Sequence, residues 1–366
     1  MALKTQLIPY TLKFKFDAGT SRGVLQEKKT YLLKVWNESH PEVVGWGECG
    51  PLAKLSIDDY EDLNDRIAPL IKMIDGIEMP KNTQAIYDLA FKIAGFDYPA
   101  LRFAIEVALL DLMHDGVRKV FDNDFYHSQN QIPINGLIWM GHMENMLLQI
   151  SDKVVEEFDC LKVKVGSLDF EKEVDILNYV RRKYYNRQIM LRVDANGAFK
   201  PHEALYKMKT LAFQNIHSIE QPIAAGQHDL MAELCANPPI DIALDEELIG
   251  VHKKEEKKQL LAKIKPQYII IKPTLLGGIQ SSLEWIDVAE SLNIGWWITS
   301  ALESNIGLNA ICQFTYEIKA RGHQGLGTGK LYENNFDSPL TIKKGHIYYD
   351  RNKEWDLTEL DYGEFI

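Results

Sequence analysis

Six charged residues recur along the second half of the chain at intervals close to one strand–helix unit. They are Lys162, Lys164, Asp194, Glu220, Asp245 and Lys272. The steps from Lys164 onward are 30, 26, 25 and 27 residues, and each residue lies in or ends a short apolar stretch that we interpret as a β-strand. The carboxyl ends of parallel barrel strands open at one mouth, so we expect these side chains to converge there.

Three of the six are carboxylates on neighbouring expected strands: Asp194, Glu220 and Asp245. Carboxylate oxygens suit a hard divalent cation that keeps positions for water and substrate oxygens. No cluster of His or Cys competes, which disfavours zinc. The sequence therefore predicts a Mg²⁺ site in which Mn²⁺ can substitute. A single Asp at a strand end is more often a turn residue or a helix N-cap, so the prediction depends on the joint pattern.

The two lysines of 160–165 alternate with apolar residues. On an edge strand this would indicate a solvated face, whereas helices cover the outer face of a parallel barrel, so Lys162 and Lys164 should point inward. Burial and nearby cations lower the pKa of a lysine. A neutral Lys164 could then remove a weakly acidic proton beside a carboxylate, with the metal stabilising the enediolate. Lys272 would stabilise the intermediate from the opposite wall or act as a second acid or base.

The elements that must position these residues alternate from residue 132 onward. Helices are expected at 169–183 and 201–211. Expected strands cover 132–138, 160–165, 189–194, 216–220, 240–245, 268–272, 295–299 and a short piece near Gly325. Eight such periods favour a parallel barrel, and a doubly wound open sheet is the main alternative.

The first part of the chain has a different pattern. Strands are expected at 5–17 and 30–36, loops at 19–23 and 45–51, and helices at 58–75 and 81–116. This indicates an α+β domain to about residue 125. The tail after residue 330 has strand-like residues 341–349 and is expected to pack back on the first domain.

Composition narrows the classes of partner. The chain has 366 residues and a net charge of −11, which disfavours nucleic acid and anionic membranes but not a small carboxylate substrate in a locally cationic site. The four cysteines have no metal-site spacing. There is no run of 18 apolar residues, and the N-terminal ten residues lack a signal-peptide apolar region. We expect a cytoplasmic enzyme with reduced thiols, and a homo-oligomer is compatible with the sequence.

The short motifs around the six residues together resemble the enolase superfamily and, within it, the muconate-lactonizing branch. They are Lys162-Val-Lys164, Asp194-Ala-Asn196, Glu220-Gln-Pro222, Asp245-Glu246 and Ile271-Lys272-Pro273. The resemblance implies an α/β fold: a modified TIM barrel, (β/α)7β, over residues 129–329. An α+β capping domain would cover 1–128, completed by the tail 330–366. It also implies that Lys164 is the base, Lys162 its neighbour and Lys272 the opposing group.

Within that branch the sequence looks most like the o-succinylbenzoate synthases of menaquinone biosynthesis. Arg192 and the segments Ser300-Ala-Leu-Glu-Ser304 and Gly325-Leu-Gly-Thr-Gly329 carry this resemblance. It implies a lyase that dehydrates a cyclohexadiene carboxylate bearing a succinyl group. The hydroxyls and backbone of the last two segments would contact the succinyl carboxylate. The expected substrate-binding residues are Arg192, Asn196, Ser300, Ser304, Gly327 and Thr328.

Two loops of the first domain, 19–23 with Arg22 and 47–52, match the positions of the family's substrate-closing loops. Arg22 also fits an ordinary surface charge, and the serine and glycine segments also fit plain turns. Arg192 fits a simple ion pair as well as a substrate contact.

Alternative functions share most of these residues. An N-succinylamino acid racemase or a cycloisomerase would use the same lysines and metal. A dipeptide epimerase typically carries Asp-x-Asp near the eighth strand, which 325–329 lacks, and a mandelate-type enzyme would have His in place of Lys272. A non-catalytic metal-binding scaffold is the rival from another class.

Overall fold

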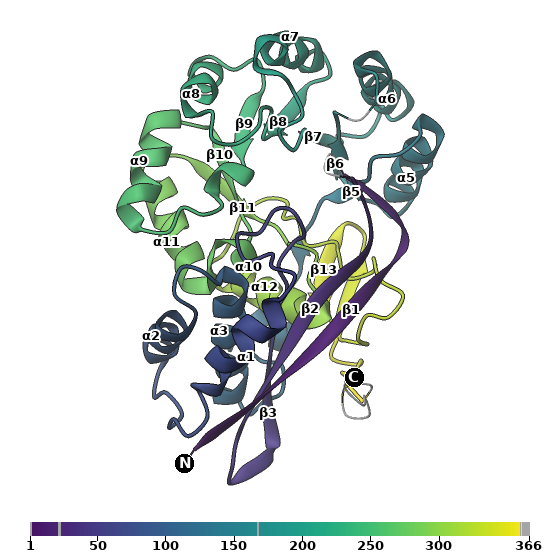
Figure 1. The fold of residues 1–366 in the computed structure, drawn as a ribbon. Coiled ribbons are helices and arrows are strands. Elements are labelled where there is room, and N and C mark those ends of the chain that lie inside the picture. The colour runs from purple at the N-terminus through teal and green to yellow at the C-terminus, as the bar shows by residue number, and fades with distance from the viewer. Residues whose placement is uncertain (1, 21–22, 167, 359, 361–366) are drawn as a thin grey trace.

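The computed structural model describes residues 2–20, 23–166, 168–358 and 360 (Figure 1). Its first part is an antiparallel sheet in the order β1-β2-β3. The strands are β1 (Leu3–Thr20), β2 (Gly23–Asn37) and β3 (His40–Cys49). Four helices follow: α1 (Leu63–Lys72), α2 (Thr83–Ala94), α3 (Pro99–Met113) and α4 (Asp124–Ser128). The strands expected at 5–17 and 30–36 are confirmed. The helix expected at 81–116 is two helices, because the chain turns at Gly95 with φ of 59°.

Residues 45–49, predicted as part of a loop, lie instead in β3, so that prediction was wrong. Glycine usually weakens a strand interior, but here α3 packs on the strand at very short range. A Cβ on Gly45 would lie 2.0 Å from the carbonyl oxygen of Ala108, and one on Gly47 would lie 2.0 Å from that of Ala104. The glycines therefore let a helix approach the strand backbone.

A seven-stranded parallel sheet forms the second part, in the order β11-β10-β9-β8-β7-β6-β5. Its strands are β5 (Gly136–Ile138), β6 (Cys160–Lys164), β7 (Met190–Asp194), β8 (Ile216–Glu220), β9 (Asp241–Leu244), β10 (Tyr268–Ile271) and β11 (Gly295–Ile298). The helices between and after them are α5 (Met143–Val155), α6 (Phe170–Lys183), α7 (Pro201–Ala212), α8 (His228–Ala236), the 3-10 turn η1 (Glu246–Leu248), α9 (Lys254–Ile264), α10 (Pro273–Leu276), α11 (Gly278–Ser291) and α12 (Asn305–Glu317). The expected alternation is confirmed, with most ends shifted by one or two residues. The strand expected at 132–138 is divided into β4 (Ile132–Pro133) and β5.

The eighth strand, expected near Gly325, is reduced to isolated bridges. Gln324 accepts a hydrogen bond of 3.0 Å from the backbone N–H of Asn135, just before β5. Gly325 donates one of 2.8 Å to Ile298 at the end of β11 and accepts one of 2.9 Å from Ser300. Residues 324–325 thus link the two edge strands of the seven-stranded sheet.

The C-terminal tail contacts both parts of the molecule. The strand pattern at 341–349 is confirmed as a hairpin of β12 (Leu340–Lys343) and β13 (His346–Tyr349), which pairs with β4 rather than with the first sheet. Residues just before it follow β1, where the N–H of Lys15 donates to Leu331 and that of Glu333 donates to Lys13, both at 2.9 Å. Residues 331–333 of the tail therefore lie against β1 of the first part. Within the described part of the chain, none of the helices has the length and apolar character needed to cross a membrane.

Helix α3 joins the two parts. It is buried on all sides from Pro99 to Asp111, which its nearly continuous apolar sequence permits. Glu106 is fully buried and accepts a hydrogen bond of 2.5 Å from the N–H of Ile279 in the first turn of α11. Arg102 lies 3.3 Å from Glu106. Burial raises the pKa of Glu106 to about 8, although Arg102 opposes the shift.

Candidate active site

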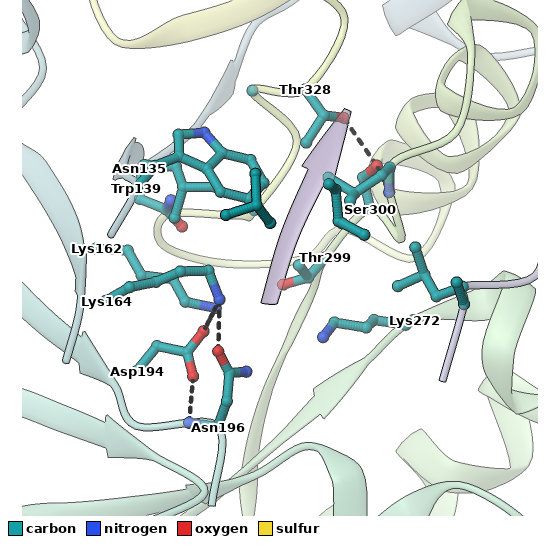
Figure 2. A pocket seen from close by; sticks show the side chains of 18 of the residues that line it. Asn135, Trp139, Lys162, Lys164, Asp194, Asn196, Lys272, Thr299, Ser300 and Thr328 are labelled. Carbon is teal, nitrogen blue, oxygen red and sulfur yellow. Dashed lines mark hydrogen bonds and ion pairs between the residues drawn. The ribbon is translucent and has the colours of Figure 1, made fainter. Parts of the chain in front are cut away.

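A cavity of about 200 Å³ opens at the carboxyl ends of the parallel strands (Figure 2). Its floor and walls include Lys162, Lys164 and Asp194, with Lys272 opposite. The first part of the chain contributes residues 23–25 and 52–54. The two loops expected to cover the site therefore reach the cavity with Gly23 and Leu52, whereas Arg22 lies outside the described residues.

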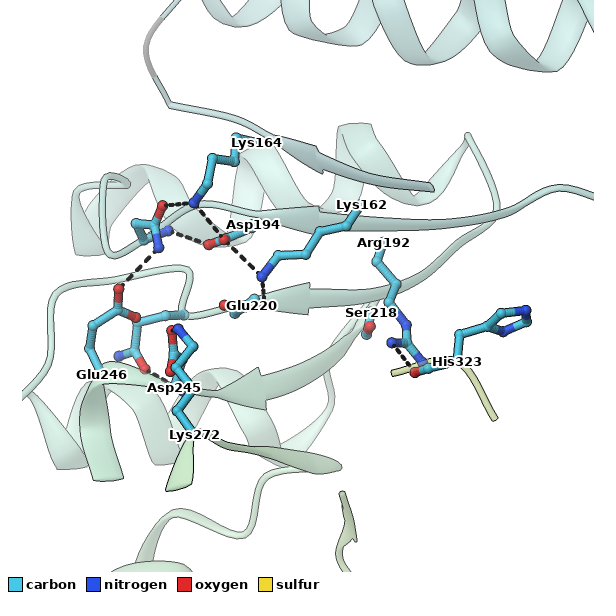
Figure 3. A network of polar contacts seen from close by, with 12 residues as sticks. Lys162, Lys164, Arg192, Asp194, Ser218, Glu220, Asp245, Glu246, Lys272 and His323 are labelled. Atoms are coloured by element: carbon cyan, nitrogen blue, oxygen red, sulfur yellow. Dashed lines mark hydrogen bonds and ion pairs between the residues drawn. The ribbon is translucent and has the colours of Figure 1, made fainter. Parts of the chain in front are cut away.

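The structure brings all six of the charged residues into one buried network (Figure 3). Nζ of Lys162 lies 3.0 Å from Oδ2 of Asp194 and 2.5 Å from Oε2 of Glu220. Nζ of Lys164 lies 2.9 Å from the same oxygen of Asp194. Lys272 pairs with Asp245 from the neighbouring strand end. The expected convergence at one mouth is confirmed, because the register of β6, β7 and β8 aligns Lys164, Asp194 and Glu220.

The charges in this network shift one another. For Asp194, burial favours the neutral form, but Lys162 and Lys164 hold its pKa well below the usual range. Burial, followed by the neighbouring Asp194, raises the pKa of Glu220. For Lys162 and Lys272, burial lowers the pKa, yet the carboxylates outweigh it and leave both values raised. At these two lysines the nearby carboxylates therefore influence the pKa more than burial and neighbouring cations do.

The carboxylates fit a hard cation in chemical type. Among the described residues, no three carboxylate, His or Cys side chains already surround one point as metal ligands. Lysine ammonium groups bridge the carboxylates instead. Oε1 of Glu220 is nevertheless buried and has no hydrogen-bond partner among the residues that the structure describes. Carboxylate oxygens are of the chemical type that Mg²⁺ prefers.

Asn196 connects the network to η1, the 3-10 turn after β9. Its side-chain oxygen accepts a hydrogen bond of 2.7 Å from Nζ of Lys164, and its amide nitrogen donates one of 3.0 Å to Glu246. Its backbone N–H donates to Asp194 at 3.0 Å. Asn196 has a φ of 43°, a left-handed conformation that asparagine tolerates better than most residues. It lines the cavity as expected, and its side chain also orients Lys164.

Gln221 fixes the backbone beside Asp245. It is fully buried, and its side-chain oxygen accepts from the N–H groups of Asp245 at 3.2 Å and Glu247 at 3.3 Å. Its amide nitrogen donates to the carbonyl of Ile223 and to the side chain of Glu247, both at 3.0 Å. The ends of β8 and β9 are thereby held together.

The six expected substrate-binding residues divide into two groups. Asn196, Ser300, Gly327 and Thr328 line the cavity. Arg192 does not: it donates 2.9 Å to the carbonyl of His323, and its guanidinium carbon lies 4.0 Å from the ring centroid of Trp297 (Figure 3).

Ser304 does not line the cavity either. Its hydroxyl donates to Glu48 at 2.5 Å and accepts from the N–H of Ile306, which caps α12. A direct substrate contact of Arg192 or Ser304 stays a prediction that this placement does not favour.

Several cavity residues were not singled out from the sequence. Asn135 is buried, and within the described part of the chain its side-chain oxygen has no hydrogen-bond partner. Trp139 follows β5, and Thr299 follows β11. Extending the strand-end rule from charged to polar and aromatic residues would have identified Thr299 and Trp139.

The comparisons with known proteins agree with this geometry. Residues 145–352 match the family model described as enolase C-terminal domain-like. The chain is 42% identical to o-succinylbenzoate synthase from Desulfotalea psychrophila, over 91% of this chain and 95% of that protein.

Solved structures extend the likeness to the three-dimensional fold. The crystal structure of MenC from the same organism has a TM-score of 0.84 at 37% identity and covers 95% of this chain and 100% of its own. A hydrophobic dipeptide epimerase from Enterococcus faecalis is 25% identical over 82% of each chain. The family match and the close relative together show that this chain belongs to the enolase superfamily.

Proposed function

We propose that the chain is an o-succinylbenzoate synthase, a hydro-lyase. It converts 2-succinyl-6-hydroxy-2,4-cyclohexadiene-1-carboxylate to o-succinylbenzoate and water in menaquinone biosynthesis. The observation that carries this proposal is the 42% identity to the enzyme of that name across nearly the full length of both chains. The buried lysines and carboxylates at the cavity supply the chemistry that the reaction needs.

The reaction removes the proton next to the ring carboxylate and the hydroxyl from the adjacent carbon. Nζ of Lys164 takes the proton, the C–O bond breaks, and the same proton leaves with the hydroxyl as water. Asn196 and Asp194 hold Lys164 in place through contacts of 2.7 and 2.9 Å. Lys272, on the opposite wall, places positive charge near the substrate carboxylate. Formation of an aromatic ring drives the reaction forward.

We assign Asp194, Glu220 and Asp245 as ligands of Mg²⁺, with Mn²⁺ able to substitute. When bound, the dication supplies positive charge where the substrate carboxylate gains negative charge. A dipeptide epimerase of the same fold, from Enterococcus faecalis, has been solved in complex with Mg. Lys162 lies between Asp194 and Glu220 and adjusts the charge balance of that site.

We infer that the seven parallel strands close into a (β/α)7β barrel through residues 324–325. The links from this segment to Ile298 and Asn135 at the two edges of the sheet support this closure. Residues 1–128 would form the capping domain, residues 129–329 the barrel, and the tail 330–366 would complete the cap. We also place the enzyme in the cytoplasm, acting on a small carboxylate substrate. All four cysteines are buried and free, which is consistent with a reducing compartment.

Racemisation of N-succinylamino acids is the second candidate. The chain is 25% identical to an N-succinyl-L-Arg/Lys racemase from Bacillus cereus over 90% of its length. Removal of a proton beside a carboxylate is the first step of both reactions. One enzyme can therefore carry both activities.

The decisive experiment is conversion of the cyclohexadiene substrate by the purified chain with Mg²⁺, followed by the absorbance of the aromatic product. Lys164→Ala should abolish turnover while the fold and Mg²⁺ binding persist, and Lys209→Ala, at an exposed position, is the matched control. No product from the native chain would refute the proposed function. Native turnover by Lys164→Ala would refute the base assignment and leave the function standing. Proton exchange at the α-carbon of an N-succinylamino acid in heavy water, followed by nuclear magnetic resonance, measures the second activity.

A further inference from the structure

Two hydroxyl groups form part of the cavity wall away from the lysine pair. Ser300 follows β11, and Thr328 belongs to the loop after residues 324–325. Their side-chain oxygens lie 2.8 Å apart, and the residues are only 4% and 7% exposed (Figure 2). Either oxygen could donate in this pair taken alone, so its direction depends on what else each hydroxyl contacts.

A carboxylate behind the cavity wall determines the direction of the hydrogen bond between Ser300 and Thr328. Glu303 is fully buried, and Oε2 accepts hydrogen bonds from the hydroxyl of Ser300 at 2.5 Å and the N–H of Ala301 at 2.8 Å. Its other oxygen accepts from the hydroxyl of Thr274 at 2.5 Å. An ionised carboxylate only accepts, and bonds from hydroxyls to it are short and strong. The hydrogen of Ser300 is therefore committed to Glu303.

The hydrogen-bonding capacity left on Ser300 follows from counting its hydrogen and its lone pairs. A serine hydroxyl has one hydrogen and two lone pairs. The hydrogen goes to Glu303, one lone pair accepts from the N–H of Leu302 at 3.1 Å, and the other is left for Thr328. Thr328 must then be the donor in the pair. Ser300 is saturated, and Thr328 has no hydrogen left for a ligand.

We propose that Thr328 is a hydrogen-bond acceptor for the substrate, with its polarity set by Glu303 acting through Ser300. This wall then selects a ligand that presents an O–H or N–H group and disfavours a carboxylate oxygen. The assignment reverses the expectation that the hydroxyls of Ser300 and Thr328 donate to the succinyl carboxylate. Thr328 determines specificity, and Glu303 is a positioning residue. The inference rests on the proposed function, because the substrate enters this same cavity.

A purely structural role of Glu303 would also explain its contacts with Ala301 and Thr274. The two readings differ in ligand preference. If Glu303 only stabilises the loop, its loss affects all ligands alike. If Glu303 sets the direction of the hydrogen bond between Ser300 and Thr328, its loss changes the relative affinity of donor and acceptor ligands.

The test compares two compounds that differ at one position as inhibitors of the dehydration reaction. N-succinyl-L-phenylalanine has an amide N–H where O-succinyl-L-phenyllactate has an ester oxygen. With the Mg²⁺-loaded enzyme, the amide should inhibit at least about tenfold more strongly, because the ester would place a lone pair against Thr328. Thr328→Val should bring the ratio of the two inhibition constants close to one. Thr328→Ser keeps the hydroxyl and should keep the ratio.

Glu303→Gln provides an independent arm. The side-chain amide introduced by this substitution can donate to Ser300. Ser300 can then donate to Thr328, and Thr328 can donate into the cavity. The preference for the amide inhibitor over the ester inhibitor should therefore fall or invert. Equal inhibition by both compounds in the native enzyme, or binding of neither while dehydration proceeds, overturns the inference. A native enzyme that forms no o-succinylbenzoate refutes the proposed function instead, so the two failures are distinguishable.

Discussion

The side-chain oxygen of Asn196 accepts a hydrogen bond of 2.7 Å from Nζ of Lys164, the proposed base. The bond orients the amine beside Asp194. Asn196→Gly should lower kcat by roughly 10- to 100-fold, because a misplaced base loses much of the general-base contribution. KM should change little, because the proposed partners of the substrate carboxylate are Lys272 and Mg²⁺ rather than Asn196. Steady-state kinetics on the dehydration reaction measures both constants.

Glycine is the informative replacement at position 196 because the backbone there has a φ of 43°. Alanine would add strain to the loss of the side chain. Asn215→Gly is the matched control, since Asn215 has a φ of 49° and is exposed outside the cavity. Unchanged kcat in Asn196→Gly would show that Lys164 needs no orientation by Asn196.

Lys162 neutralises two carboxylates at once, Asp194 and Glu220. Lys162→Met should leave uncompensated buried negative charge and lower the free energy of unfolding by about 3–5 kcal/mol in the absence of divalent cations. Added Mg²⁺ should restore much of that loss, because a ligand that binds only the folded state stabilises it. Urea unfolding with and without Mg²⁺ checks both statements. In Lys209→Met, which alters an exposed lysine, the free energy of unfolding should equal that of the native chain both without and with Mg²⁺.

Glu48 of β3 binds the first turn of α12 across the boundary between the two parts of the chain. Its carboxylate accepts from the N–H of Ser304 at 2.9 Å, the hydroxyl of Ser304 at 2.5 Å and the N–H of Gly307 at 3.1 Å. Glu48→Gln removes the charge at a helix N-terminus and replaces one accepting oxygen by a donor. The free energy of unfolding should fall by about 2–3 kcal/mol.

The control for this variant is Glu42→Gln, at an exposed position on the same strand. It should change the free energy of unfolding by less than about 0.5 kcal/mol. Equal effects of the two substitutions, measured by urea unfolding, would exclude a special role of Glu48.

The contrast between these sites shows what could be read from the sequence. Lys164, Asp194 and Glu220 could be predicted to meet because strand ends recur at one strand–helix interval, and parallel register then brings them together. Contacts such as Glu48 with Ser304 and Glu106 with Ile279 join residues 256 and 173 positions apart. No periodicity relates such pairs, so their pairing appears only in the folded chain.

One local prediction failed, and another was met only by short bridges. Glycines in 45–51 indicated a loop, whereas Gly45 and Gly47 lie in a strand because α3 packs against its backbone. The eighth strand was expected as a short piece near Gly325, and the chain makes isolated bridges there. In both places tertiary packing, rather than local propensity, decides the backbone conformation.

Asp58 is a buried carboxyl in the first part of the chain. It is fully buried, and one oxygen accepts a hydrogen bond of 2.9 Å from the N–H of Ala100 at the start of α3. The other oxygen has no hydrogen-bond partner among the described residues. Burial raises the pKa of Asp58 from 3.8 to about 7, although the bond from Ala100 opposes the shift. The folded state therefore binds a proton that the unfolded state releases at lower pH.

Between pH 4 and pH 7 this group makes folding less favourable as pH rises, at about 1.4 kcal/mol per pH unit, and the effect is level above pH 7. Asp58→Asn cannot ionise and can still accept from Ala100. Its free energy of unfolding relative to the native chain should therefore increase by about 2–3 kcal/mol from pH 5 to pH 7, then stay constant to pH 8. Urea unfolding of both proteins at the three pH values measures the difference, and Asp59→Asn, at an exposed neighbouring position, is the control. A difference that is constant from pH 5 to pH 8 would show that Asp58 does not titrate in this range.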